Sequence, residues 1–279
     1  MSKELSGKPV AQKIREQVAH DVKQLTAKGV TPTLALVVAT KDEAANSYIQ
    51  LICKTAEKVG ITTKMVELGE DAAYEGIAVA LTKLADDDSV HAIILQTPLP
   101  EGVDGDDLRG HIPTNKDVDG ANPVSAGLLF CGLKSFVPAT AAAVMAILQE
   151  YKVPLSGSHT VVVGRSRVVG KPLAHLLLNE DATVTLCHSK TKNLAEITKQ
   201  ADILVAAAGR EGLITKEHVK PGAIVIDVGT NMTANGMVGD VDAVSVGEVA
   251  SGLSPVPGGV GPVTTAILLQ QTVQAATSL

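Results

Sequence analysis

The first half of the chain alternates short strand-like segments with longer stretches in which apolar residues recur every three to four positions. The short segments predict strands at 33–39, 62–68 and 91–96, and the periodic stretches predict helices over 7–27, 44–59 and 74–84. Strands separated by helices in this order favour a parallel sheet with helical crossover connections.

A stretch with repeated Gly, Asp and Pro follows over 101–138, and a second series of elements begins after it. The pattern predicts a helix over 139–151, helices starting near Gly170 and Asn193, a final helix over 262–278, and strands at 160–163, 183–186, 203–207 and 223–228. We therefore expect two α/β units, hinged near 138–150, with a last helix that could return to the first unit.

Composition narrows the class of protein. Hydrophobic residues make up 45% of the chain but aromatic residues only 2%, so the core must be aliphatic, as in parallel sheets covered by helices. A net charge of -6 without a basic block predicts no nucleic-acid surface. We expect neither a signal peptide nor a membrane span. Three cysteines without metal-ligand spacing predict reduced thiols, no metal site and a cytoplasmic protein.

A candidate nucleotide site follows the predicted strand at 160–163. The turn reads Gly164-Arg165-Ser166-Arg167-Val168-Val169-Gly170-Lys171-Pro172. Glycines at a strand-to-helix turn let the main chain approach a diphosphate, and the N-terminus of the next helix offers free N–H groups. Because the spacing is GxSxxxG rather than GxGxxG, an ordinary turn between strand and helix stays the alternative.

The end of the next predicted strand bears on which dinucleotide would bind. An acidic residue there accepts from the ribose 2′-hydroxyl of NAD, whereas a basic residue accommodates the 2′-phosphate of NADP. The segment 187–192 offers Ser189, Lys190 and Lys192 and no carboxylate, and Arg165 could reach the same place. This favours NADP. The alternative is that both lysines lie in a solvated turn, and that His188 is a loop residue without a role.

Seven motifs, taken in order, carry a family resemblance. They are Gln96-Thr97-Pro98-Leu99-Pro100, Lys116-Asp117-Val118-Asp119-Gly120, the turn 164–172, and the segments 188–194, 226–229, 239–242 and 255–262. Over residues 7–272 they resemble the methylenetetrahydrofolate dehydrogenase/cyclohydrolase family. The octamer PVPGGVGP and the pentamer KDVDG are highly specific.

The resemblance implies two α/β domains with a cleft between them, the C-terminal one Rossmann-like. Residues 1–138 plus 262–279 would form a folate-binding catalytic domain, and residues 139–261 an NADP-binding domain. It implies a homodimer that takes a tetrahydrofolate derivative as substrate. The family oxidises 5,10-methylenetetrahydrofolate to the methenyl cation and usually hydrolyses that cation to 10-formyltetrahydrofolate.

Site residues follow from the same resemblance, position by position. The catalytic residues would be Tyr48, Gln96 and Asp119. Tyr48 and Asp119 would also bind the substrate, with its edge formed by Pro257, Gly258, Gly259 and Pro262. NADP would be held by Gly164, Arg165, Ser166, Val169, Gly170, Ser189, Lys190 and Thr230.

One departure concerns the catalytic lysine. The family pattern Tyr-x-x-x-Lys-x-Lys reads here Tyr48-Ile49-Gln50-Leu51-Ile52-Cys53-Lys54, so the first lysine is Ile52. Lys54 is two residues further, about 200° around a helix, and would point elsewhere. Hydride transfer removes no proton, but hydrolysis of the cation needs proton movement, to which general acid–base catalysis contributes roughly 10²–10⁴-fold. We therefore expect a dehydrogenase with weak or absent cyclohydrolase activity.

Other departures lie on the folate side, in the segments 40–45, 119–123 and 138–143. The alanines after Pro138 could equally serve helix stability, because alanine is the best helix former. Three alternatives stay open. They are a fully bifunctional enzyme using Lys54 or water, a non-catalytic paralogue that binds a dinucleotide or folate, and a related dehydrogenase acting on a different small molecule.

Overall fold

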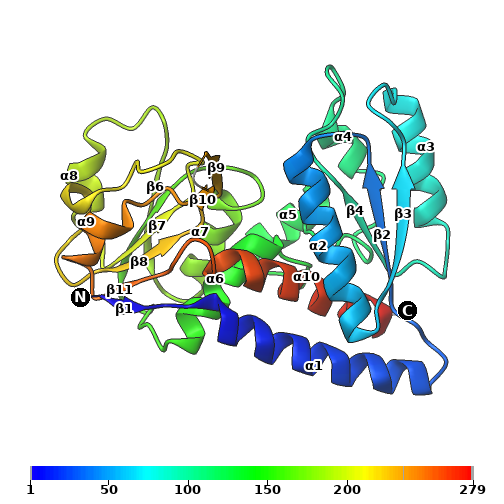
Figure 1. Ribbon diagram of the computed structural model, residues 1–279, viewed down its shortest axis with the longest axis horizontal. Helices are drawn as coiled ribbons and strands as arrows, with labels where there is room; N and C mark the ends of the chain where they lie inside the picture. Colours follow the sequence, from blue (N-terminus) through cyan, green and yellow to red (C-terminus); the bar gives the residue numbers. More distant parts are fainter. Residues whose placement is uncertain (1, 235, 278–279) are drawn as a thin grey trace. The chain divides into compact units, whose positions relative to one another are not determined.

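The computed structural model describes residues 2–234 and 236–277, which divide into two compact units (Figure 1). The C-terminal unit comprises the residues up to Gln12 together with 138–264, and the N-terminal unit comprises residues 13–137 and those from Thr265 onward. Helices α1 (Gly7–Ala27) and α10 (Val260–Thr277) each contribute to both units.

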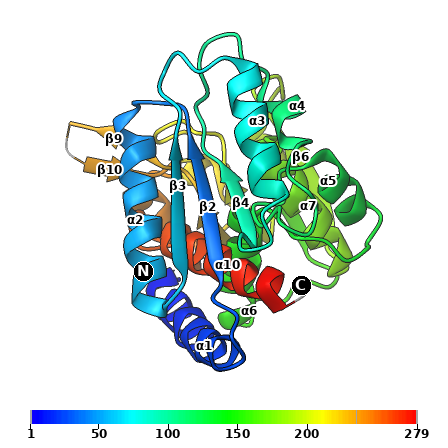
Figure 2. The ribbon, with the colours of Figure 1, turned by 90° about the vertical axis from the view of Figure 1, so that its right-hand side faces the viewer.

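The N-terminal unit is built on a three-stranded parallel sheet of order β3-β2-β4. The strands are β2 (Thr33–Val38), β3 (Thr62–Glu67) and β4 (Ala92–Leu95). Helices α2 (Glu43–Val59) and α3 (Tyr74–Ala85) lie on either side of this sheet (Figure 2). Two short helices, α4 (Gly105–Arg109) and α5 (Pro123–Phe130), follow in the stretch with repeated Gly, Asp and Pro. The central strand β2 is apolar because both of its faces are covered.

Helix α2 shows how the local sequence sets the register of the candidate site. Its N-cap, Asp42, accepts from the main-chain N–H of Ala45 at 2.7 Å, and Gly60 ends it in the left-handed conformation at φ 86°. Its buried residues recur at helical spacing: Ala45, Ile49, Ile52, Ala56 and Val59. The caps and this stripe place Ile52 on the buried side of the helix.

The C-terminal unit contains a six-stranded sheet of order β1-β11-β8-β7-β5-β6, in which every strand pair is parallel. Its strands are β1 (Lys3–Glu4), β5 (His159–Val163), β6 (Thr183–Cys187), β7 (Ile203–Ala206), β8 (Ile224–Asp227) and β11 (Gly252–Leu253). The helices are α6 (Ala139–Glu150), α7 (Gly170–Asn179), α8 (Leu194–Thr198), the 3-10 helix η1 (Lys216–His218) and α9 (Ala243–Gly247). Strands β9 (Asn231–Thr233) and β10 (Gly236–Val238) form an antiparallel pair.

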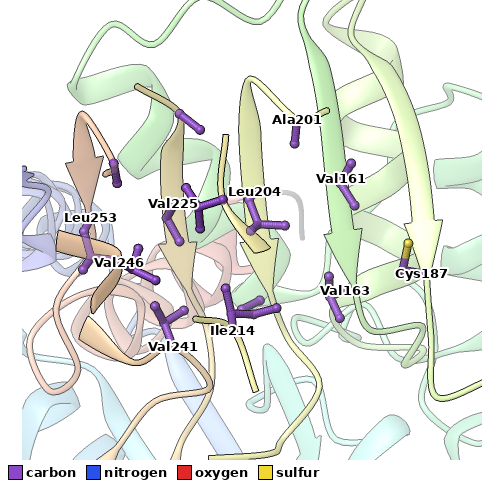
Figure 3. Close-up of a cluster of buried hydrophobic side chains, with 14 residues drawn as sticks. Val161, Val163, Cys187, Ala201, Leu204, Ile214, Val225, Val241, Val246 and Leu253 are labelled. Carbon is purple, nitrogen blue, oxygen red and sulfur yellow. The ribbon is translucent and has the colours of Figure 1, made fainter. Parts of the chain in front are cut away.

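Aliphatic side chains fill the core beside this sheet (Figure 3). Val161, Leu204 and Val225 come from three neighbouring strands. Ile214, from the loop between β7 and η1, and Val246, from α9, belong to the same cluster. Burying a side chain of this size stabilises the fold by about 1.5–3 kcal/mol. The core is thus aliphatic, as the composition predicts.

The predicted α/β class and the main strands and helices are confirmed. The sequence pattern did not predict β1, β9, β10, β11, α4, α5 or α9, all of which are short. Residues 2–12 group with the C-terminal unit, although the prediction places them in the first domain, because β1 pairs with β11. In the part of the chain described, no helix is both long and apolar enough to cross a membrane.

Candidate active site

The turn between β5 and α7 is shaped by two glycines. Gly164 has φ 138°, and a Cβ atom there would lie 2.0 Å from the carbonyl oxygen of Ala207. A Cβ atom on Gly170 would lie 2.0 Å from the carbonyl oxygen of Gly164. Both positions therefore require glycine for the close approach of main chain to main chain.

The free donors of this turn are not those that the sequence predicts. The first turn of α7 is already occupied, because Lys171 N–H donates to Ser166 O and Leu173 N–H donates to Val169 O. The N–H groups of Arg165, Ser166 and Val169 make no main-chain hydrogen bond among the described residues. The loop, rather than the helix N-terminus, therefore offers the main-chain donors to an anion.

The loop after β6 lies beside this turn, since Gly164 N–H donates to Cys187 O at 2.9 Å. His188 has a structural role there, because its Nδ1 accepts from Lys190 N–H at 3.1 Å. Ser189 and Lys190 are exposed, as is Arg165 on the neighbouring loop. The structure thus brings the predicted 2′-phosphate residues to one edge of the sheet, without an acidic side chain between 187 and 192.

Two buried carboxylates organise the loops after β7 and β8. Asp240 accepts from the N–H groups of residues 208, 209 and 210 and from Asn231 Nδ2. Asp227 accepts from the N–H groups of residues 229, 240 and 241, and burial raises its pKa to about 6. The motifs 226–229 and 239–242 therefore shape the loop that carries the exposed Thr230.

On the folate side, Tyr48 lies within electrostatic range of Asp119. Tyr48 is half-buried on α2, and its pKa is raised by burial and by the charge of Asp119, while the nearby hydroxyl of Thr265 lowers it. Burial and the charge of Asp117 raise the pKa of Asp119 to about 7, and Arg109 opposes this rise. The pair offers a phenol and a carboxyl group whose charge changes near neutral pH.

The loop that carries Asp119 is held by its neighbours. Lys116 is buried and donates from Nζ to the carbonyls of residues 84, 85 and 87 at the end of α3. The Asp117 carboxylate accepts from Ala121 N–H and Asn122 N–H. Gln271 of α10 contacts the main chain of Val118. In the KDVDG segment, Lys116 and Asp117 therefore have structural contacts, and Asp119 is the residue whose charge acts on Tyr48.

The remaining predicted catalytic positions, Gln96 and Ile52, show no link to Tyr48 or Asp119 in the described hydrogen bonds. Gln96 follows β4, but its Nε2 donates to the carbonyl of Thr97 at 2.7 Å rather than to Tyr48 or Asp119. Ile52 is fully buried. Lys54 is exposed and lines a surface hollow of about 490 Å³ with Glu57 and Thr63. Lys54 therefore does not take the place of Ile52 in this structure.

The predicted substrate-edge residues belong to the C-terminal unit: Pro257, Gly258, Gly259 and Pro262. Gly258 has φ 108°, and its carbonyl accepts from Gly7 N–H at 2.9 Å. A Cβ atom on Gly259 would lie 2.4 Å from the carbonyl oxygen of Pro255. The glycines of the octamer thus let this loop pack against its own main chain and against the start of α1.

The sequence analysis did not single out Thr265 or Gln271, because each lies beside a residue of the same type on α10 and no motif marks it. Both lie in the N-terminal unit with Tyr48 and Asp119. Within 2–234 and 236–277, no three His, Cys, Asp or Glu side chains form a group that could hold a metal ion.

Comparison with known proteins assigns both halves of the chain. Residues 5–119 match the model described as tetrahydrofolate dehydrogenase/cyclohydrolase, catalytic domain, and residues 138–279 match the NAD(P)-binding domain of the same family. The bifunctional protein FolD 1 of Saccharopolyspora erythraea is 54% identical over 276 residues, covering 99% of this chain and 94% of the relative. The bifunctional protein FolD of Parafrankia sp. is 54% identical over 272 residues, covering 98% of each chain.

Solved structures give the same result. The bifunctional FolD methylenetetrahydrofolate dehydrogenase/cyclohydrolase of Campylobacter jejuni superposes with a TM-score of 0.97 at 39% identity, covering 100% of this chain and 99% of that one. The Trypanosoma brucei methylenetetrahydrofolate dehydrogenase-cyclohydrolase, complexed with NADP and an inhibitor, has a TM-score of 0.95 at 36% identity, with coverages of 99% and 98%.

Proposed function

Because the chain belongs to the tetrahydrofolate dehydrogenase/cyclohydrolase family, we propose that it oxidises 5,10-methylenetetrahydrofolate to 5,10-methenyltetrahydrofolate by hydride transfer to NADP. The observation that carries this proposal is the match of both family domains over nearly the whole chain, together with the glycine-shaped turn after β5. Methylenetetrahydrofolate dehydrogenase activity is supported by the family and by its named relatives.

NADP is the cofactor, and it supplies the hydride acceptor when bound. The turn fits its diphosphate, since the loop N–H groups of Arg165, Ser166 and Val169 are available and a Cβ atom at Gly164 or Gly170 would close the turn. Arg165, Ser189 and Lys190 would hold the 2′-phosphate, and Thr230 would contact the dinucleotide from the loop after β8.

On the folate side, this chain's residues bind and orient the substrate. The Asp119 carboxylate would accept hydrogen bonds from the N–H donors of the pterin ring, which the ionised form does best. Tyr48 would lie against the ring and donate from its phenol. The reacting carbon loses hydride and no proton, so positioning carries this step.

Cyclohydrolase activity is the second candidate function. The relatives at 54% identity are named bifunctional proteins, which favours the fully bifunctional alternative over the predicted loss of this activity. The predicted loss depends on Ile52, a fully buried aliphatic side chain where the family pattern has its catalytic lysine. Hydrolysis in the native chain would need Lys54 or water in that lysine's role.

One assay separates these functions. Methylenetetrahydrofolate and NADP are added to the protein, and NADPH formation and methenyltetrahydrofolate absorbance are followed together. NADPH with accumulating methenyl product supports a dehydrogenase alone. NADPH with methenyl loss well above the spontaneous rate, abolished by Lys54→Ala, supports the bifunctional enzyme.

Variants and a binding measurement sharpen the assay. Ile52→Lys should hydrolyse the methenyl product faster than the parent. Ile49→Lys, which places a lysine at a similarly buried position of the same helix, should not. Absence of NADPH would overturn the proposed activity. Tight binding of NADP or tetrahydrofolate without turnover would then point to the non-catalytic paralogue, and no folate binding would point to a different substrate.

The family resemblance also predicts a homodimer in the cytoplasm. Light scattering on the purified protein tests the assembly, because a dimer of this 28.7 kDa chain has twice the scattering mass of the monomer.

A further inference from the structure

Helix α10 carries four threonines that share a helix but differ in what their hydroxyls do. Thr264, Thr272 and Thr277 each donate to the carbonyl four residues earlier, at 3.2, 3.0 and 2.8 Å. This is the usual arrangement of a threonine inside a helix. Thr265 makes no such bond, although its side chain is only 3% exposed and its Oγ1 has no hydrogen-bond partner among the described residues.

The hydroxyl of Thr265 has one neighbour among the predicted folate-site residues. It lies near the phenol of Tyr48 and lowers the pKa of that group, yet the two oxygens are outside hydrogen-bond geometry. A buried hydroxyl that does not donate to a carbonyl of its own helix is expected to have another hydrogen-bond partner.

We propose that Thr265 is a positioning residue of the folate site, whose hydroxyl donates to the phenol oxygen of Tyr48 when substrate binds. The phenol proton is then directed to an acceptor on the substrate instead of to Thr265. The inference rests on the proposed function and deepens it. In this inference a side chain on α10, Thr265, orients Tyr48. Position 52 of α2, where the family pattern has a lysine, is an isoleucine in this chain.

The test compares Thr265→Val, Thr265→Ser and Tyr48→Phe with the double variant Thr265→Val/Tyr48→Phe. A neutral hydrogen bond corresponds to about a 2- to 12-fold change, so Thr265→Val should raise KM for methylenetetrahydrofolate by that factor, with kcat within about twofold. Thr265→Ser should restore most of the parent KM. In the Tyr48→Phe background, Thr265→Val should have no further effect, because the partner oxygen is gone.

Thr272→Val is the matched control on the same helix, since Thr272 is also fully buried but bonds to Leu268 O. It should lower the thermal midpoint and leave KM unchanged. Thr265→Val should show the opposite pattern, because removing an unpartnered buried hydroxyl does not lower stability. A structural role alone would move the midpoint of both variants and the KM of neither.

Three results would overturn the inference: an unchanged KM in Thr265→Val, an equal effect of that exchange in the Tyr48→Phe background, or no rescue by serine. If the parent shows no dehydrogenase activity, the proposed function fails separately. The same variants are then compared for tetrahydrofolate binding by calorimetry. Weaker binding by Thr265→Val but not by Thr272→Val still supports the inferred Thr265–Tyr48 hydrogen bond. Absence of binding by the parent overturns that inference.

Discussion

The side-chain amide of Gln271 joins the last helix to the residue that precedes Asp119. Its Nε2 donates to the carbonyl of Val118 at 2.6 Å and to that of Val137 at 3.0 Å, while its Oε1 accepts from Val137 N–H at 3.1 Å. Gln271 is only 7% exposed, so these bonds form in the interior. One amide therefore fixes both the Asp119 loop and the end of the 101–138 stretch against α10.

Replacing this amide should destabilise the protein and weaken the folate site. We expect Gln271→Leu to lower the free energy of unfolding by about 2–4 kcal/mol, because three hydrogen bonds are lost and buried main-chain groups are left unpaired. Urea denaturation measures the loss. Gln270→Leu, the same exchange at the less buried neighbouring position, should change stability far less, and equal losses in both variants would contradict this account.

A lysine at position 52 should be costly even where it adds activity. Ile52 is fully buried, so Ile52→Lys places an ammonium group in an apolar environment and should destabilise the fold by about 3–5 kcal/mol. The same environment should depress the pKa of the new lysine, which suits it to accept a proton. Thermal denaturation in parallel with Ile49→Lys tests this, and an unchanged midpoint for Ile52→Lys would show that the site already admits water.

Folate binding should depend on pH through Asp119. Its pKa is raised to about 7 by burial and by the charge of Asp117, so the carboxylate forms as the pH rises through neutrality. If the ionised form holds the pterin, KM for methylenetetrahydrofolate should fall roughly tenfold from pH 6 to pH 8. Asp119→Asn should bind more weakly with a flat profile over this range. A parent KM independent of pH would show that the carboxyl group does not bind as its anion.

Arg165 should determine the preference for NADP over NAD. Its exposed guanidinium stands on the turn beside the Ser189 loop, and a charged hydrogen bond to a 2′-phosphate corresponds to about 10- to 100-fold in affinity. We expect Arg165→Ala to raise KM for NADP by that factor and to leave KM for NAD unchanged. Arg167→Ala, two residues further in the same loop, is the control, and equal effects on both dinucleotides would assign Arg165 a general role.

Local sequence determined the elements and the family of this protein. Helix α2 could be predicted because its apolar period and Gly60 act over a few residues, and the strands β2 and β5 because their apolar runs are continuous. The glycines of the turn 164–170 and of the octamer could also be recognised in the sequence. A main chain with positive φ or with a close main-chain neighbour accepts few residues other than glycine. Tyr48 and Asp119 were predicted as site residues through motifs, and in the structure the charge of Asp119 acts on Tyr48.

Tertiary structure decided the features that depend on residues far apart in the chain. Strand β1 exists only because β11, about 250 residues later, pairs with it, and no local pattern marks two residues as a strand. Asp227 and Asp240 lie in two of the family motifs, and only the structure shows that their carboxylates accept from main-chain N–H groups. Thr265 and Gln271 lie on a helix with other threonines and glutamines, and nothing in the sequence separates the unpartnered hydroxyl of Thr265 or the bridging amide of Gln271 from these. Their roles follow from which groups the fold brings within reach, and sequence spacing carries no such information.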